Sequence, residues 1–126
     1  MKLASCFPIA VIAALAVTGT VQAQPQEGAD RSWQLAGSLG MLQFVVVSEA
    51  RAKERALYNE AIAALCAPGA TCFLRFFTNS SGASLGVPLS DAILAEPTAM
   101  YQRSAKQGNE IFQWSCRLAM PGGNCF

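Results

Sequence analysis

The sequence predicts a small single domain of the α/β or α+β class, with three or more strands and two helices in the order β-α-β-α-β. Three observations predict this class. Strand-like and helix-like patterns alternate along the chain, no repeat or second linker interrupts them, and an even number of cysteines remains once the leader is removed. We expect two disulfides to staple the domain.

The first 23 residues resemble an export signal. Lys2 precedes an uncharged apolar run at residues 7–17, and Val21 and Ala23 are small enough for a signal peptidase. The run is too short for a bilayer core, which needs about 20 apolar residues. We therefore expect cleavage after Ala23, loss of Cys6 with the leader, and a periplasmic or secreted protein.

Beyond the leader, residues 24–32 are polar and aperiodic, which indicates a flexible arm before a globular domain at 33–126. The whole chain has nine Lys and Arg against eight Asp and Glu. Loss of Lys2 makes the two counts equal. A neutral domain argues against nucleic acid as a partner and against electrostatic anchoring to a membrane.

The first strand is expected at residues 41–47, a run rich in β-branched and aromatic side chains. A helix should follow at 50–65, because Ser48 suits its N-cap, alanine favours helix, and apolar residues recur every three or four positions. Pro68 and the glycine after it should end it. Short connections on both sides favour parallel first and second strands joined by a right-handed crossover.

The second strand is expected at residues 71–79, with Cys72, Leu74 and Phe76 on one face and Phe73, Arg75 and Phe77 on the other. A second helical region should begin at Ser90 and end near Gly108, with Pro97 kinking it or starting a new helix. The last strand is expected at residues 110–118.

Four cysteines allow three pairings, of which two are plausible. Cys72 would face Cys116 if the second and last strands were antiparallel neighbours. If these strands are parallel, that pair lies too far apart along the sheet for a disulfide. We favour the local pairing, Cys66 with Cys72 and Cys116 with Cys125.

The composition removes several kinds of chemistry. The chain contains no histidine, which excludes Ser-His-Asp and Cys-His mechanisms and, with no C-x-x-C pair, argues against a zinc site. The acidic residues are scattered, and those at 49–60 read as a solvated helix face. We expect no catalytic residue, no metal and no cofactor.

Three weaker motifs have ordinary structural explanations. Ser104 and Lys106 are too close in sequence for a serine–lysine pair. The serine- and glycine-rich stretch at 79–86 lacks the lysine of a phosphate loop. Asn79 begins a glycosylation acceptor, which has meaning only in a eukaryotic secretory host.

The remaining signal is a group of aromatic and arginine side chains on two strands. If the helices cover the opposite face of the sheet, an apolar patch with two guanidinium groups is left open. Residues of these types are enriched where proteins bind one another. The expected binding residues are Phe73, Arg75, Phe77, Gln113 and Arg117, with Ile111 beside them.

The sequence therefore predicts a small exported binding or interaction module. Its partner would be another exported or envelope protein, or a small ligand. Two alternatives remain open: an enzyme that works through carboxylates, tyrosine or lysine without histidine, and a structural envelope component that self-associates through a free strand edge.

Overall fold

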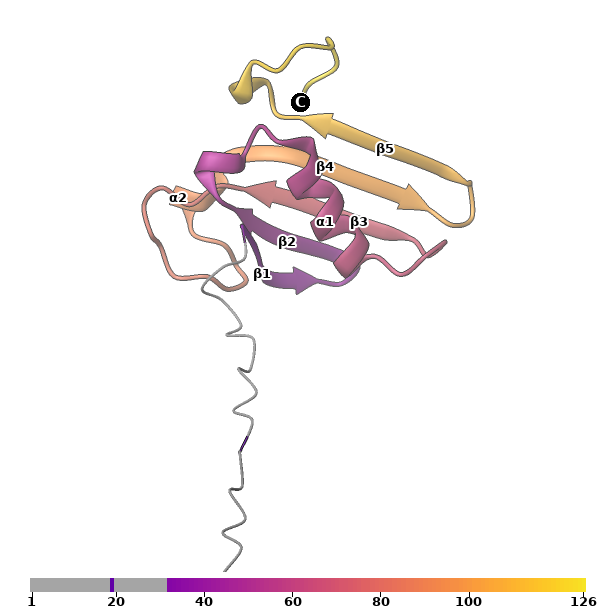
Figure 1. The fold of residues 1–126 in the computed structure, drawn as a ribbon, viewed down its shortest axis with the longest axis horizontal. Helices are drawn as coiled ribbons and strands as arrows, with labels where there is room; N and C mark the ends of the chain where they lie inside the picture. The colour runs from indigo at the N-terminus through magenta and orange to yellow at the C-terminus, as the bar shows by residue number, and fades with distance from the viewer. Residues whose placement is uncertain (1–18, 20–31) are drawn as a thin grey trace, which may run out of the picture.

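A computed structural model describes Gly19 and residues 32–126. The expected leader, apart from Gly19, and the expected arm, apart from Ser32, lie outside the described residues. The described part forms a five-stranded mixed sheet with strands in the order β1-β2-β3-β4-β5 (Figure 1). The strands are β1 (Trp33–Leu39), β2 (Leu42–Val47), β3 (Cys72–Phe77), β4 (Pro97–Ser104) and β5 (Asn109–Trp114).

The helices are few and short. After the 3₁₀ turn η1 (Glu49–Arg51), helix α1 (Arg55–Leu65) carries the chain from β2 to β3, and these two strands are parallel as expected. All other neighbouring strands are antiparallel. The remaining elements are the four-residue helix α2 (Asp91–Leu94) and the 3₁₀ turn η2 (Cys116–Leu118).

The expected β-α-β-α-β order is wrong in its second half. Only residues 91–94 of the expected helical region are helical, and β4 occupies 97–104 as the strand between β3 and β5. Pro97 stands at the first position of this strand, where its missing N–H matters least. Ala99 and Tyr101 then point toward α1, so the stretch follows the two-residue period of a strand.

Two further boundaries differ from expectation. Strand β1 was not expected, and it forms a hairpin with β2 through a two-residue turn whose Gly40 has a φ of 59°. The last strand ends at Trp114 instead of residue 118, because Ser115 caps η2 by accepting from the N–H of Arg117.

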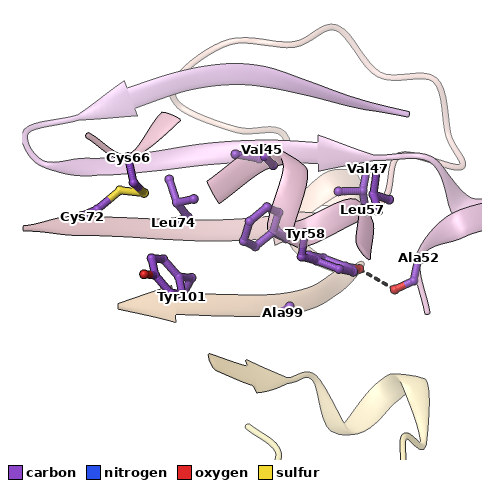
Figure 2. Close-up of a cluster of buried hydrophobic side chains, with 12 residues drawn as sticks. Val45, Val47, Ala52, Leu57, Tyr58, Cys66, Cys72, Leu74, Ala99 and Tyr101 are labelled. Carbon is purple, nitrogen blue, oxygen red and sulfur yellow. Dashed lines mark hydrogen bonds between the residues drawn. A yellow bond between two sulfur atoms is a disulfide. The ribbon is translucent and has the colours of Figure 1, made fainter. Parts of the chain in front are cut away.

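The main core lies between α1 and one face of the sheet. Tyr58 on α1 is fully buried, and its ring packs edge-to-face against Phe76, Phe112 and Trp114 at centroid distances of 4.9, 5.6 and 5.1 Å. Its hydroxyl donates to the carbonyl of Ala52 across 2.5 Å (Figure 2). Burial raises the pKa of Tyr58 to about 12, because the site disfavours the phenolate.

The opposite face of the sheet is covered over only part of its area. Residues 78–96 leave the end of β3 and pass behind the sheet, where Leu89 and Ile93 pack on Phe77, Phe44 and Val46. The Glu96 carboxylate anchors this segment by accepting from the backbone N–H and the hydroxyl of Ser80, and these hydrogen bonds lower the pKa of Glu96.

Both disulfides join residues close in sequence. Cys66 at the end of α1 pairs with Cys72 at the start of β3, and Cys116 pairs with Cys125. This is the local pairing that the sequence favours. The antiparallel alternative fails because β4 separates β3 from β5. Arg103 stabilises the loop that the Cys66–Cys72 disulfide closes, because it donates to the carbonyls of Ala70 (2.8 Å) and Ala67 (2.6 Å).

Candidate functional site

The part of the sheet that residues 78–96 leave uncovered is the candidate binding face, which we call the open face. On it, residues of neighbouring strands stand opposite one another in two rows. Side chains that pair directly across strands share a face of the sheet. The outer row is Leu39, Leu42, Phe73, Gln102 and Ile111, and the inner row is Gly37, Phe44, Arg75, Met100 and Gln113. Gly37 and Phe44 lie against residues 78–96, so the open part of the inner row begins at Arg75.

The outer row is largely apolar and accessible. Leu39 and Ile111, on the two edge strands, are 65% and 42% exposed, and Phe73 between them is half-buried. Five strands at about 4.8 Å spacing make the row about 19 Å wide. An apolar stripe of this kind, crossing a whole sheet, is typical of a surface that packs against another protein.

Arg75 lies across the inner row. One terminal nitrogen of its guanidinium is 3.3 Å from the Met100 sulfur, and its Cζ atom lies 5.8 Å from the centre of the Phe126 ring. No carboxylate of the described residues pairs with it, since both ion pairs found there belong to Arg51. The positive charge of Arg75 is therefore available to a binding partner.

A hollow of about 390 Å³ interrupts the open face near the β4–β5 turn. Apolar contact there comes from Phe73 and Ile111. Hydrogen-bonding groups surround them on Gln102, Ser104, Gln107 and Asn109. The open face therefore offers apolar contact and polar groups together, the mixture found at transient protein interfaces.

Three of the five binding residues expected from the sequence lie on this face: Phe73, Arg75 and Gln113. The other two do not belong to it. Phe77 points the same way but is 7% exposed beneath Leu89 and Ile93. Arg117 lies in η2 beyond the end of β5, where it donates to the carbonyls of Pro97 (3.0 Å) and Glu96 (3.3 Å) and to the Thr78 hydroxyl (3.1 Å).

The two arginines consequently have different roles. Arg117 is structural, because its hydrogen bonds join η2 to the β3–β4 connection. The Arg75 guanidinium contacts the Met100 sulfur and the exposed Phe126 ring. Sequence reasoning missed Gln102 and Met100, because it treated β4 as helix. It also missed Leu39 and Leu42, although the turn signal at Gly40 between two apolar runs was available to reveal a hairpin.

The weaker motifs have structural explanations. The Asn79 amide donates to the Ala83 carbonyl (2.7 Å), and its oxygen accepts from the Ala83 N–H (3.0 Å) and the Ser81 hydroxyl. This side chain organises the 79–86 loop. Ser104 accepts from the N–H of Gln107 in the β4–β5 turn, next to the exposed Lys106.

The described residues contain no cluster of three or more acidic or cysteine side chains able to hold a metal ion. Nor does any helix among residues 32–126 have the length and apolar character needed to cross a bilayer.

Tyr101, like Tyr58, is buried in the main core, and burial raises its pKa.

The chain was compared with models of protein families, with curated proteins and with solved structures, and none of them matches it.

Proposed function

We propose that the protein is a small exported binding module that holds another exported protein on its open face. The observation that carries this proposal is the apolar row on the open face, from Leu39 through Phe73 to Ile111. Beside it lies Arg75, which forms no ion pair within the described residues. Aromatic and arginine side chains contribute disproportionately to binding energy at protein interfaces.

The two disulfides support the proposed location in an oxidising compartment. Each closes a loop of a small domain, and disulfides persist in oxidising environments such as the periplasm or the extracellular space. The leader expected at residues 1–23 points the same way. The proposal therefore places both the module and its partner outside the cytoplasm.

The partner is proposed to be a protein because of the width of the open face. A row about 19 Å wide that crosses all five strands is broader than a small ligand needs. An enzymatic alternative has less support in the described residues, where the two carboxylates that meet at Arg51, Glu54 and Glu60, are exposed, and the tyrosines with raised pKa values belong to the core.

Site-specific photo-cross-linking in the native host tests the proposal. A photoreactive residue in place of Ile111 should give one discrete adduct of fixed mass, and the same residue in place of Glu60, an exposed position on α1, should not. The substitution Arg75→Glu should weaken the adduct, whereas Lys53→Glu, which changes charge by the same amount away from the open face, should leave it unchanged.

Other outcomes would contradict the proposal. Equal labelling from positions 111 and 60 would mean that contacts are non-specific. An adduct with twice the mass of the chain would assign the open face to self-association instead. Circular dichroism of the Arg75→Glu variant separates loss of binding from loss of folding.

A further inference from the structure

A second concave site lies on the other side of the sheet, independent of the open face. It is a pocket of about 280 Å³ between the start of α1, the strand β5 and the C-terminal loop. Its lining consists of Arg55, Phe112, Trp114 and residues 120–125. The volume lies just below the range of about 300 to 1,000 Å³ for drug-sized ligands, which suits a smaller molecule.

Aromatic rings make the floor of this pocket rigid. Phe112 and Trp114 pack edge-to-face with centroids 5.1 Å apart, and both rings contact the fully buried Tyr58. Because Tyr58 is fixed in the core, both rings are held in place, and Trp114 presents a preorganised apolar surface while Phe112 lies under the Arg55 guanidinium. Binding an apolar group there requires little reordering of the protein.

Arg55 forms one wall of the pocket. Its Cζ atom lies 3.5 Å from the centre of the Phe112 ring, and its Nε donates to the Asn59 side chain across 3.2 Å. These two contacts fix the plane of the guanidinium and leave the N–H groups of both terminal nitrogens without an acceptor among the described residues.

No carboxylate of the described residues neutralises Arg55. Glu110 is near enough to act on it electrostatically but does not lie within ion-pair distance, and both ion pairs in residues 32–126 involve Arg51. Partial burial also lowers the pKa of Arg55, as expected for a cation whose hydration is incomplete.

The opposite wall is a loop held in place by the Cys116–Cys125 disulfide. Gly122 and Gly123 adopt φ values of 120° and 87° in this loop, and their N–H groups donate no hydrogen bond within the described residues. Met120 adds an adaptable apolar side chain. The pocket thus combines an apolar floor, a fixed guanidinium and unused backbone donors.

We propose that this pocket binds a carboxylate carried on a small aromatic group. The planar fork of Arg55 matches the two oxygens of a carboxylate, and charge-assisted bonds of this kind are among the strongest in proteins. The aromatic body of the ligand packs against Trp114 and Met120, since the guanidinium already covers Phe112.

Titration followed by two-dimensional NMR tests the site, with phenylacetate as the probe and neutral phenylacetamide as its matched analogue. Phenylacetate should shift the Trp114 indole N–H and the amides of Gly122 and Gly123. Phenylacetamide should bind much more weakly. The side-chain amide of Gln102, on the open face, should not shift with either compound.

Variants assign the effect to the guanidinium. Arg55→Gln should weaken phenylacetate binding by about tenfold or more, because the charge-assisted bonds are lost. Arg55→Lys should retain part of the affinity, and Lys53→Gln, which removes a nearby exposed charge, should change nothing. The dispersion of the NMR spectrum shows whether each variant is folded.

The proposal is overturned if phenylacetamide binds as well as phenylacetate, if Arg55→Gln binds normally, or if millimolar phenylacetate shifts no pocket resonance. A free acid and the end of a polypeptide share this chemistry. A short peptide ending in phenylalanine with a free carboxylate separates them, because tighter binding than phenylacetate assigns the pocket to a peptide terminus and weaker binding assigns it to a free acid.

Discussion

At the scale of single residues, burial of Tyr58 makes the free energy of unfolding depend on pH. Burial disfavours the phenolate, and the hydroxyl donates to the Ala52 carbonyl, so the pKa of Tyr58 rises to about 12 from an ordinary value of 10. Below pH 10 the folded and unfolded chains both hold the proton. Between pH 10 and 12 the unfolded chain loses it first, so stability falls over that window.

We expect the free energy of unfolding to fall by about 2 to 3 kcal/mol through Tyr58 as pH rises from 10 to 12. Tyr58→Phe should cost about 1 kcal/mol at neutral pH, through loss of the hydrogen bond to Ala52, and should flatten this fall. Urea unfolding of both proteins at a series of pH values, with disulfides intact, measures the difference.

Tyr101 contributes to the same alkaline fall, because burial raises its pKa as well. The fall in the Tyr58→Phe variant should therefore be smaller than in the natural chain but not absent. Identical slopes in the two proteins would contradict the assignment of the alkaline loss to Tyr58.

The residue scale also shows what side-chain alternation can predict. The two-residue period of β3 correctly separates Phe73 and Arg75 from Leu74 and Phe76. It says nothing about what covers each face. Phe77 was therefore expected on the surface, although Leu89 and Ile93 bury it through a tertiary contact.

At the scale of elements, β1 and β4 show why the strand order was only partly predictable. The pairing of β1 shifts between Leu35 and Gly37, and that of β4 shifts near Thr98. A bulge of this kind breaks the alternation that identifies a strand in sequence. By contrast, β2 and β3 pair without interruption in parallel register, and their existence and direction were predicted.

Gly37 gives a test of how residues 78–96 pack on the hairpin of β1 and β2. A Cβ atom at this position would lie 2.5 Å from Cγ2 of Val87. Gly86 has nearly the same backbone angle, with φ of 153° against 157°, but has open space around it. We expect Gly37→Ala to destabilise the fold by about 1 to 3 kcal/mol more than Gly86→Ala, through overpacking.

Removing the obstructing methyl groups provides the control. In a Val87→Ala background, Gly37→Ala and Gly86→Ala should have nearly equal effects on the denaturant midpoint. If the excess cost of Gly37→Ala persists there, the contact between Gly37 and Val87 does not explain it.

At the scale of the whole molecule, the two faces of the sheet are covered unequally. Helix α1 lies on one face of the sheet (Figure 1). Residues 78–96 pack on part of the other face, and the outer row lies beyond the residues they contact. The sequence predicted an open patch on condition that both helices lie on the opposite face. Only α1 does so, because α2 is a single turn on the same side as Phe77.

The two disulfides hold different parts of the fold in place. One fixes the crossover that carries α1 onto the sheet, and the other fixes the C-terminal loop beside β5. The sequence favoured this local pairing but left the pair of Cys72 and Cys116 open, which the strand order excludes because β4 lies between β3 and β5. The pocket at Arg55 was not predictable, since it depends on a loop, a helix terminus and a strand that meet only in the folded chain.

Radical footprinting most directly tests the claim that the open face is a protein-binding surface. The labelling of each side chain would be compared between the purified protein and the protein in its native compartment. We expect Leu39, Phe73 and Ile111 to be labelled several-fold less in the native compartment, while Leu94, exposed elsewhere on the molecule, is labelled equally in both. Equal labelling of all four residues in the two settings would contradict the account.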